Sequence, residues 1–155
     1  MARRNYGTQW AGQFGVAHEL MRRGYLVSFT MGNAPGRDLL CVSPKGKEFS
    51  IQVKSLRGRG LFLYQDALLH ATESPYIVFV MVPKSPDERP EYFVMNNTWF
   101  RRIAKKENAR RADAYRKKHG KSDTSSFTAW DLSYRVLATS ELPIKGEAAW
   151  NNLPR

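Results

Sequence analysis

Apolar residues recur along this 155-residue chain with two different periods, and the period changes at glycines and prolines. A spacing of three and four residues over 8–23 predicts an amphipathic helix that ends before Gly24. Strands are predicted by alternating or continuous apolar runs at 25–30, 37–43, 48–55, 76–82 and 92–95. The run at 76–82 is apolar throughout, which is typical of a central strand buried on both faces.

The connecting segments predict turns and further helices. The turn at 44–47 separates two strands so closely that we expect an antiparallel hairpin. A helix is expected over 61–72, and Asn97 or Thr98 could cap another that runs to His119 and ends at Gly120. A short strand or extended segment over 127–132 and a helical turn over 147–153 complete the series.

This order of elements predicts an α/β or α+β fold in which a mixed sheet is flanked by helices. The length predicts one domain over 1–155, with its core at about 8–100 and a basic C-terminal segment over 97–155.

Composition narrows the class of protein. Hydrophobic residues make up 42 % of the chain, which argues against disorder, and Cys41 is the only cysteine, which excludes a disulfide or a thiolate zinc site within one chain. No apolar run approaches the roughly 20 residues of a membrane helix, and none follows the N-terminal arginines, so we expect a cytoplasmic protein without a membrane partner. Lys and Arg outnumber Asp and Glu by 25 to 14, and the net charge of +11 attracts polyanions, nucleic acid above all.

The predicted hairpin carries the residues that could perform chemistry. Asp38 lies on one strand, and Gln52 and Lys54 lie on its neighbour, two residues apart and therefore on the same face. A carboxylate, an amide oxygen and an ammonium could then surround one point, where a divalent metal accepts oxygen ligands and a lysine stabilises developing charge. Alternation alone also fits ordinary solvent-facing residues of an amphipathic strand.

In their order along the chain, residues 36–40 (GRDLL) and 49–55 (FSIQVKS) resemble the PD-(D/E)XK nuclease superfamily. The stretch 12–25 (GQFGVAHELMRRGY) resembles the first helix of a group of small bacterial proteins in that superfamily. The resemblance implies a restriction-endonuclease-like fold, with Asp38 and Gln52 as metal ligands, Lys54 as a catalytic group and Mg²⁺ or Mn²⁺ as cofactor. It further implies double-stranded DNA as partner, a substrate that a homodimer would suit.

The chain departs from the superfamily at two positions. Gln52 stands at the second acidic position, a variant found in several branches, and Gln13 stands where members often bring a Glu to the metal. On a helical wheel Gln13 falls in the apolar arc, with Glu19 on the other side near Gly12, so Gln13 should face the sheet. There it is either a core amide bonded to a backbone edge or a metal-site residue that has lost its charge, and Asp38 is the only sure carboxylate.

Basic residues gather between Arg101 and Lys121, where ten cations face two anions. This imbalance favours a helix that lies along a phosphate backbone over a merely solvated face, and Arg57 and Arg59 form a second patch beside the proposed site. The residues expected to contact nucleic acid are Arg57, Arg59, Arg101, Arg102, Lys105, Lys106, Arg110, Arg111, Lys117 and Lys118.

Three functions fit the sequence. The first is a metal-dependent DNA phosphodiester hydrolase with Asp38, Gln52, Lys54 and Gln13 at its site. The second is a catalytically silent protein on the same scaffold that binds DNA. The third is an interaction protein with a basic face. No phosphate-binding glycine loop or nucleophile-elbow motif supports a nucleotide-binding enzyme or a serine hydrolase.

Overall fold

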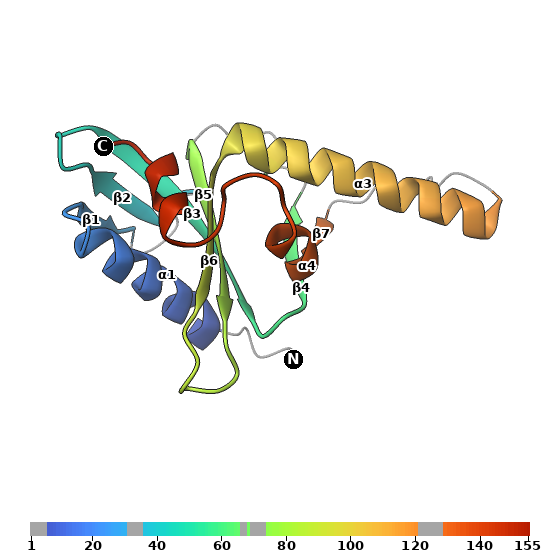
Figure 1. The fold of residues 1–155 in the computed structure, drawn as a ribbon, viewed down its shortest axis with the longest axis horizontal. Coiled ribbons are helices and arrows are strands. Elements are labelled where there is room, and N and C mark those ends of the chain that lie inside the picture. The colour runs from blue at the N-terminus through green and yellow to red at the C-terminus, as the bar shows by residue number, and fades with distance from the viewer. Residues whose placement is uncertain (1–5, 31–35, 66–67, 69–73, 121–128) are drawn as a thin grey trace.

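The computed structural model describes residues 6–30, 36–65, 68, 74–120 and 129–155, and the fold is α/β (Figure 1). A five-stranded mixed sheet in the order β1-β2-β3-β5-β6 forms its centre, and β4 and β7 form a separate two-stranded sheet. The strands are β1 (Leu26–Phe29), β2 (Leu39–Val42), β3 (Glu48–Arg57), β4 (Leu61–Gln65), β5 (Tyr76–Val82), β6 (Glu91–Asn96) and β7 (Ala129–Ser133).

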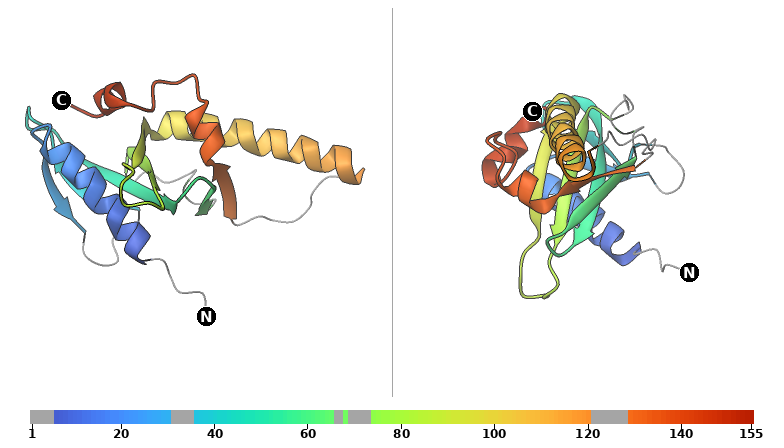
Figure 2. Two further views of the ribbon diagram at one scale, coloured as in Figure 1. Left: turned by 60° about the horizontal axis from the view of Figure 1, so that its bottom comes forward. Right: turned by 90° about the vertical axis from the view of Figure 1, so that its right-hand side faces the viewer.

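Helices cover both faces of the main sheet. They are α1 (Tyr6–Met21), α3 (Asn97–His119), α4 (Tyr134–Ala138) and the 3₁₀-helix η1 (Glu147–Asn152). Residues of α1 and η1 share one hydrophobic cluster with the sheet, whereas α3, α4 and the small sheet contribute to a second cluster on the other face. The views in Figure 2 show α1 and β1 along the same edge of the molecule.

The sheet combines an antiparallel meander with one parallel pair. β1, β2 and β3 are antiparallel neighbours, which confirms the predicted hairpin, and Gly46 supplies the positive φ of 84° in its turn. β3 then pairs with β5 in parallel, and β5 pairs with β6 in antiparallel fashion. A parallel pair needs a long crossover connection, and here the chain makes it between β3 and β5.

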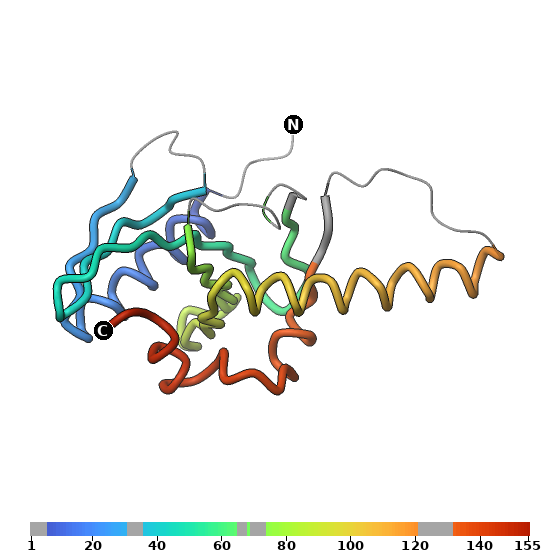
Figure 3. The backbone as a smooth tube through the Cα atoms, turned by 90° about the horizontal axis from the view of Figure 1, so that it is seen from above, coloured from blue at the N-terminus to red at the C-terminus, as the bar shows by residue number. Residues whose placement is uncertain are grey.

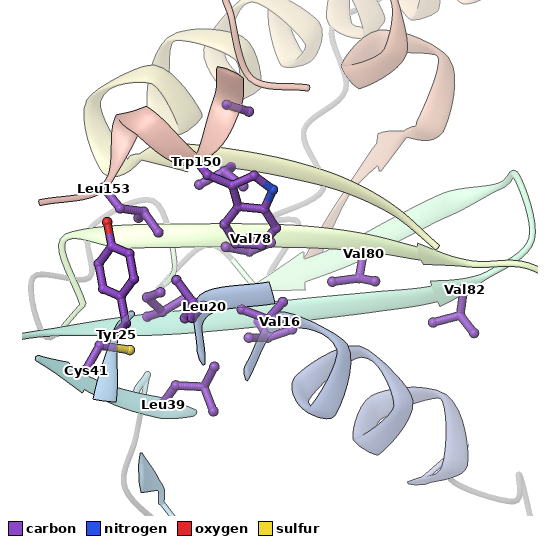
Figure 4. Close-up of a cluster of buried hydrophobic side chains, with 14 residues drawn as sticks. Val16, Leu20, Tyr25, Leu39, Cys41, Val78, Val80, Val82, Trp150 and Leu153 are labelled. Carbon is purple, nitrogen blue, oxygen red and sulfur yellow. The ribbon is translucent and has the colours of Figure 1, made fainter. Parts of the chain in front are cut away.

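β5 is central, as its uninterrupted apolar run predicts. Its side chains alternate between the two clusters, so that Val78 and Val80 join the cluster beneath α1, which Figure 4 shows, and Ile77 and Phe79 join the cluster beneath α3. All four side chains are fully buried. Each full burial of this kind stabilises the fold by about 1.5–3 kcal/mol, so one strand holds both layers together.

The helix expected over 61–72 is wrong for its first part, because 61–65 is strand β4. Its side chains alternate, with Phe62 and Tyr64 each 2 % exposed and Leu61 and Leu63 exposed at 46 % and 72 %. All four residues of the run LFLY are apolar, so the hydropathy does not alternate and does not predict a strand, although burial alternates. Residues 66–67 and 69–73 lie outside the described residues.

Other boundaries also need correction. α3 is capped by the side chain of Asn96, which accepts a hydrogen bond from the Trp99 N–H, and not by Asn97 or Thr98; its predicted end at Gly120 is confirmed. The five-residue helix α4, capped by Ser133, was not expected. The strand predicted over 127–132 is β7, which runs to Ser133 and whose first predicted residues lie outside the described parts. No helix among the described residues is long and apolar enough to cross a membrane.

Gly12 sets how closely α1 approaches the sheet. A Cβ atom at Gly12 would lie 1.8 Å from Ser55 Oγ and 2.8 Å from Ser55 Cβ. The expectation that Gly12 lies on the side of the helix away from the sheet is therefore wrong. Phe14 is 57 % exposed and lies on the outer side of α1. The helix presents Gly12, Gln13, Val16 and Leu20 to the interior, which brings Gln13 down to the level of the strands.

We predict that Gly12→Ala destabilises the protein by about 1–3 kcal/mol, because the added methyl group overlaps Ser55. Gly7→Ala in the same helix is the control, since no atom lies within 4 Å of a Cβ there, and alanine favours a helix over glycine. Urea unfolding gives the free energies of both variants, of Ser55→Gly and of the Gly12→Ala/Ser55→Gly double mutant. Gly12→Ala should destabilise the Ser55→Gly protein less than it destabilises the wild type, because the side chain that the new methyl group overlaps is gone. A stabilised Gly12→Ala protein would contradict the close approach.

Candidate active site and nucleic-acid interface

Asp38 lies where β2 begins, and its backbone ties together the strands on either side. Its N–H donates to the Ile51 carbonyl of β3 at 3.0 Å. Its own carbonyl accepts a hydrogen bond from the Thr30 N–H at 3.1 Å, just beyond β1. These two backbone hydrogen bonds therefore hold Asp38 in place independently of its side chain.

The Asp38 carboxylate joins α1 to β3. Its Oδ2 accepts the Val53 N–H at 2.7 Å, and its Oδ1 accepts a hydrogen bond from Gln13 Nε2 at 3.0 Å. Gln13 is only 5 % exposed, which confirms that it faces the sheet. Its partner is the Asp38 side chain and not a backbone edge, so the structure brings together two of the residues singled out in the sequence.

Lys54 shares an electrostatic environment with Asp38. Burial raises the pKa of Asp38 above its ordinary value, although the Val53 N–H and the Lys54 charge act in the opposite direction. Burial lowers the pKa of Lys54, and the nearby Asp38 opposes that change. Each charge is therefore costly alone and is offset in part by the other, a pattern that clusters at functional sites.

Gln52 lies on the strand face that the sequence predicts. In the register of β3 with β5, Gln52 pairs with Ile77 and Lys54 with Phe79, and both of these partners belong to the cluster beneath α3. The ladder between β2 and β3 ends with the pair Leu39 and Ile51, so Asp38 and Gln52 are the residues next to its last pair. Among the described contacts, no hydrogen bond joins the Gln52 side chain to Asp38 or Lys54.

The acidic ligands around Asp38 are few. Within the described residues, no group of three His, Cys, Asp or Glu side chains is placed to hold a metal ion. The donor chemistry at Asp38 still fits Mg²⁺, because each carboxylate oxygen accepts a single described hydrogen bond and a carboxylate has about four lone-pair positions. Mg²⁺ commonly takes one or two carboxylates and completes its shell with water and substrate phosphate.

The basic segment forms the long helix α3, which packs only along its first half. Phe100, Ile103, Ala104 and Glu107 are buried there. The residues 112–119, here called the basic arm, contain no buried side chain, and Figure 3 shows α3 running past the sheets. This exposure fits the predicted contact with a phosphate backbone.

Several cations of α3 are already paired with carboxylates. Glu107 is buried, and the guanidinium groups of Arg110 and Arg111 bond to it at 2.7–3.1 Å. The Arg110 hydrogen bond is the main reason that the pKa of Glu107 lies below its ordinary value. The cations of α3 with no described ion pair are Arg102, Lys105, Lys106, Lys117 and Lys118.

The two arginines after Lys54 differ in their surroundings. Arg59 pairs with Glu91 at 3.4 Å and lies over the ring of Tyr134 at 5.3 Å, and the Tyr134 hydroxyl donates to Glu91. This network was not foreseen, because 43 residues separate Glu91 from Tyr134 and no local pattern links them. Arg57 is exposed at the end of β3 and takes part in no described ion pair.

Comparisons of this chain with protein-family models, with curated proteins and with solved structures find no match.

We predict that Asp38→Ala lowers the free energy of unfolding by about 1–3 kcal/mol, because the Val53 N–H and the Gln13 amide lose their acceptor. Asp38→Asn should equal or exceed the wild type at neutral pH. Asparagine retains a carbonyl acceptor, and its NH₂ group can bond to a rotated Gln13 amide. It also removes a charge that burial disfavours. Chemical denaturation measures the free energy of unfolding of both variants. Equal stabilities of the Ala and Asn variants would show that the hydrogen bonds of Asp38 with Val53 and Gln13 do not stabilise the fold.

Proposed function

We propose that this protein is a metal-dependent DNA phosphodiester hydrolase of the PD-(D/E)XK class. The observation that carries the proposal is the Asp38 carboxylate, held at the start of β2 by Gln13 and Val53 and electrostatically coupled to Lys54. Few structural roles require a partly buried carboxylate and a partly buried lysine on adjacent strands. Phosphoryl chemistry uses both, the first as a metal ligand and the second as a cation near the developing charge.

The topology supports the resemblance noted in the sequence. α1 precedes three antiparallel strands, and the third of them pairs in parallel with the strand that follows the crossover. Asp38 lies at the start of the second strand, and Gln52 and Lys54 lie on the third. The motif residues therefore lie on neighbouring strands, with Gln52 and Lys54 on the sheet face toward α3 and Gln13 reaching Asp38 from α1.

Asp38 would hold the metal ion directly, with the Gln52 amide oxygen as an auxiliary ligand. The bound ion would polarise a phosphate and lower the pKa of a coordinated water. Lys54 would place a positive charge beside the phosphate and orient the attacking water. Gln13 acts through Asp38, because its amide fixes one carboxylate oxygen and leaves the other lone pairs free.

DNA suits the charge of the molecule as substrate. The net charge is +11, and the unpaired cations of α3 lie on an exposed helix that reaches away from the sheets. Contacts of this type recognise the phosphate backbone and not the base sequence. Arg57, at the end of the strand that carries Lys54, lies about 10 Å farther along β3 and extends the positive surface from the site.

A second function is favoured by one specific observation. The amide of Gln13 donates to Asp38 at the point where an acid would share a metal ion, and no group of three acidic or metal-ligating side chains is found among the described residues. A chain with this site could bind DNA without cutting it. The two functions differ in whether metal ions produce strand cleavage.

A plasmid-nicking assay with Mg²⁺ and Mn²⁺ tests the hydrolase. Wild-type protein should nick the plasmid, and Asp38→Asn and Lys54→Met should lose at least about 100-fold in rate. Gln13→Glu should raise the rate, because a second carboxylate beside Asp38 strengthens metal binding. Asparagine and methionine are chosen because they are similar in size to the residues they replace, so these variants should remain folded.

No cleavage by the wild type or by Gln13→Glu, under conditions in which DNA is bound, would contradict the hydrolase and leave the silent DNA-binding protein. Cleavage by Gln13→Glu alone would identify a nuclease scaffold that has lost an acid.

The basic arm is tested separately by the salt dependence of DNA binding. Lys117→Gln/Lys118→Gln should weaken binding and reduce the slope of log K against log salt by up to about 2, since each phosphate contact contributes about 0.9. Lys45→Gln/Lys47→Gln in the β2–β3 turn removes the same charge elsewhere and should leave the slope nearly unchanged. Equal effects of the two double variants, measured by fluorescence anisotropy, would show that only net charge matters.

A further inference from the structure

A groove between α3 and the segment that follows β7 is separate from the Asp38 site. One wall is α3 and the other is α4 with residues 139–142, and the groove has a volume of about 400 Å³. Volumes of roughly 300–1,000 Å³ are usual for small-molecule sites. None of Gln13, Asp38, Gln52 and Lys54 lines this groove. It is therefore a second candidate site, and its walls indicate what kind of ligand would fit.

The α3 wall of the groove carries a row of cations. Arg102, Lys106 and Arg110 follow one another at four-residue intervals, which places them on one side of the helix about 6 Å apart along its axis. All three side chains are exposed, and none of the described ion pairs includes Arg102 or Lys106. The buried carboxylate of Glu107 accepts two hydrogen bonds from the Arg110 guanidinium at 2.7 and 2.9 Å and so fixes its position. This wall suits a phosphate group, which accepts hydrogen bonds from several cations at once.

The floor of the groove is apolar. It is formed by Ile103 of α3, which is 9 % exposed, and by Val136 and Leu142 on the other side. Val136 and Leu142 are partly buried and pack against the hydrophobic cluster beneath α3. Water in contact with these side chains would be displaced by a flat or bulky organic group, which would gain from the burial of apolar surface.

The wall opposite α3 is polar and carries one negative charge. The Thr139 hydroxyl donates to the Arg135 carbonyl at 2.8 Å, so its oxygen remains available as an acceptor. The Ser140 hydroxyl accepts the Leu142 N–H at 3.2 Å. Glu141 is exposed, and none of the described ion pairs includes it. This wall therefore suits the part of a ligand that carries hydroxyl or amino groups.

We infer that this groove binds a nucleoside monophosphate group. The phosphate would lie against the cations of α3, the base would cover the apolar floor, and hydroxyl or amino groups would face Glu141. A simple inorganic anion would leave the floor uncovered, and an anion with a hydrocarbon tail would bring no donor to Glu141. The paired bases of a duplex are stacked inside the helix and cannot reach the floor. The ligand is therefore a free nucleotide or the unpaired terminal nucleotide of a strand, which share this chemistry.

Binding in this groove is independent of the proposed hydrolase activity, because the groove contains none of the residues assigned to that activity. It also goes beyond the contact of α3 with a phosphate backbone, since it gives the opposite wall, including α4, a role in holding one nucleotide unit.

Isothermal titration calorimetry with deoxyadenosine monophosphate, in the presence of a metal chelator, tests the groove. Wild-type protein should bind this nucleotide at least about tenfold more tightly than it binds deoxyadenosine or inorganic phosphate. Lys106→Gln should raise the dissociation constant by about tenfold, because it removes a charge-assisted hydrogen bond to the phosphate. Lys45→Gln is the matched control, since it removes the same charge from the exposed β2–β3 turn, and it should leave the dissociation constant nearly unchanged.

Two more variants separate the groove from other sites. Val136→Thr keeps the shape of the side chain, adds a hydroxyl group to the floor and should also weaken binding. Asp38→Asn should bind the nucleotide as the wild type does. Circular dichroism of each variant confirms that it is folded.

A short single-stranded oligonucleotide with a terminal phosphate distinguishes the two sources of the ligand. If Lys106→Gln weakens its binding more than Lys45→Gln does, the groove takes a strand end; if the two variants bind it equally, the groove takes the free nucleotide. No binding of deoxyadenosine monophosphate to the wild type, or equal affinities of Lys106→Gln and Lys45→Gln for it, would overturn the inference. Binding that is lost in Asp38→Asn and kept in Lys106→Gln would also overturn it, because the nucleotide would then occupy the proposed hydrolase site.

Discussion

The arrangement of α1, β2 and β3 depends on the hydrogen bonds of one partly buried carboxylate. Asp38 accepts the Val53 N–H at the point where β2 begins, and it accepts the Gln13 amide from α1. The helix can supply that amide because Gly12 allows it to lie directly on Ser55. The group that holds the elements together is therefore the same group that we propose for the chemistry, and Lys54 on the next strand balances part of its charge.

The hydrogen bond to Asp38 accounts for a glutamine at position 13. A partly buried carboxylate with a raised pKa is stabilised by neutral donors, and the Gln13 amide is such a donor. A glutamate in its place would bring two like charges together, and the pair would need a cation or a proton to be stable. Glutamine thus favours the fold without a metal ion, and in the proposed hydrolase it would lower the affinity of the site for a metal.

Much of the architecture can be predicted from the sequence, and the predictions that are wrong or missing have physical causes. The period of α1, the hairpin of β2 and β3 and the apolar run of β5 each identify one element, because burial on one face or on two leaves a plain pattern. β4 was mistaken for a helix because Leu61 and Leu63 are apolar yet exposed, so the pattern there does not report burial. α4 is too short for a period to be recognised.

The candidate site could be predicted in part. The shared face of Gln52 and Lys54 and the inward face of Gln13 follow from local periodicity, whereas their grouping with Asp38 rests on the resemblance to the nuclease superfamily. The hydrogen bond between Gln13 and Asp38 spans 25 residues of sequence and depends on the approach of a helix to a sheet, which no local pattern reports. The pairing of Arg59 with Glu91 and Tyr134 is equally non-local. It constrains the side chain of Arg59, which the sequence analysis predicts to contact DNA.

The most direct measurement of the central claim is an NMR titration of the labelled protein with Mn²⁺, which broadens the signals of nuclei near the bound ion. If Asp38 holds the metal, the Val53 backbone amide and the Gln13 side-chain amide should broaden first, and Asp38→Asn should abolish the effect. Broadening that begins elsewhere, or that persists at Val53 in Asp38→Asn, would contradict the assignment of Asp38 as the metal ligand.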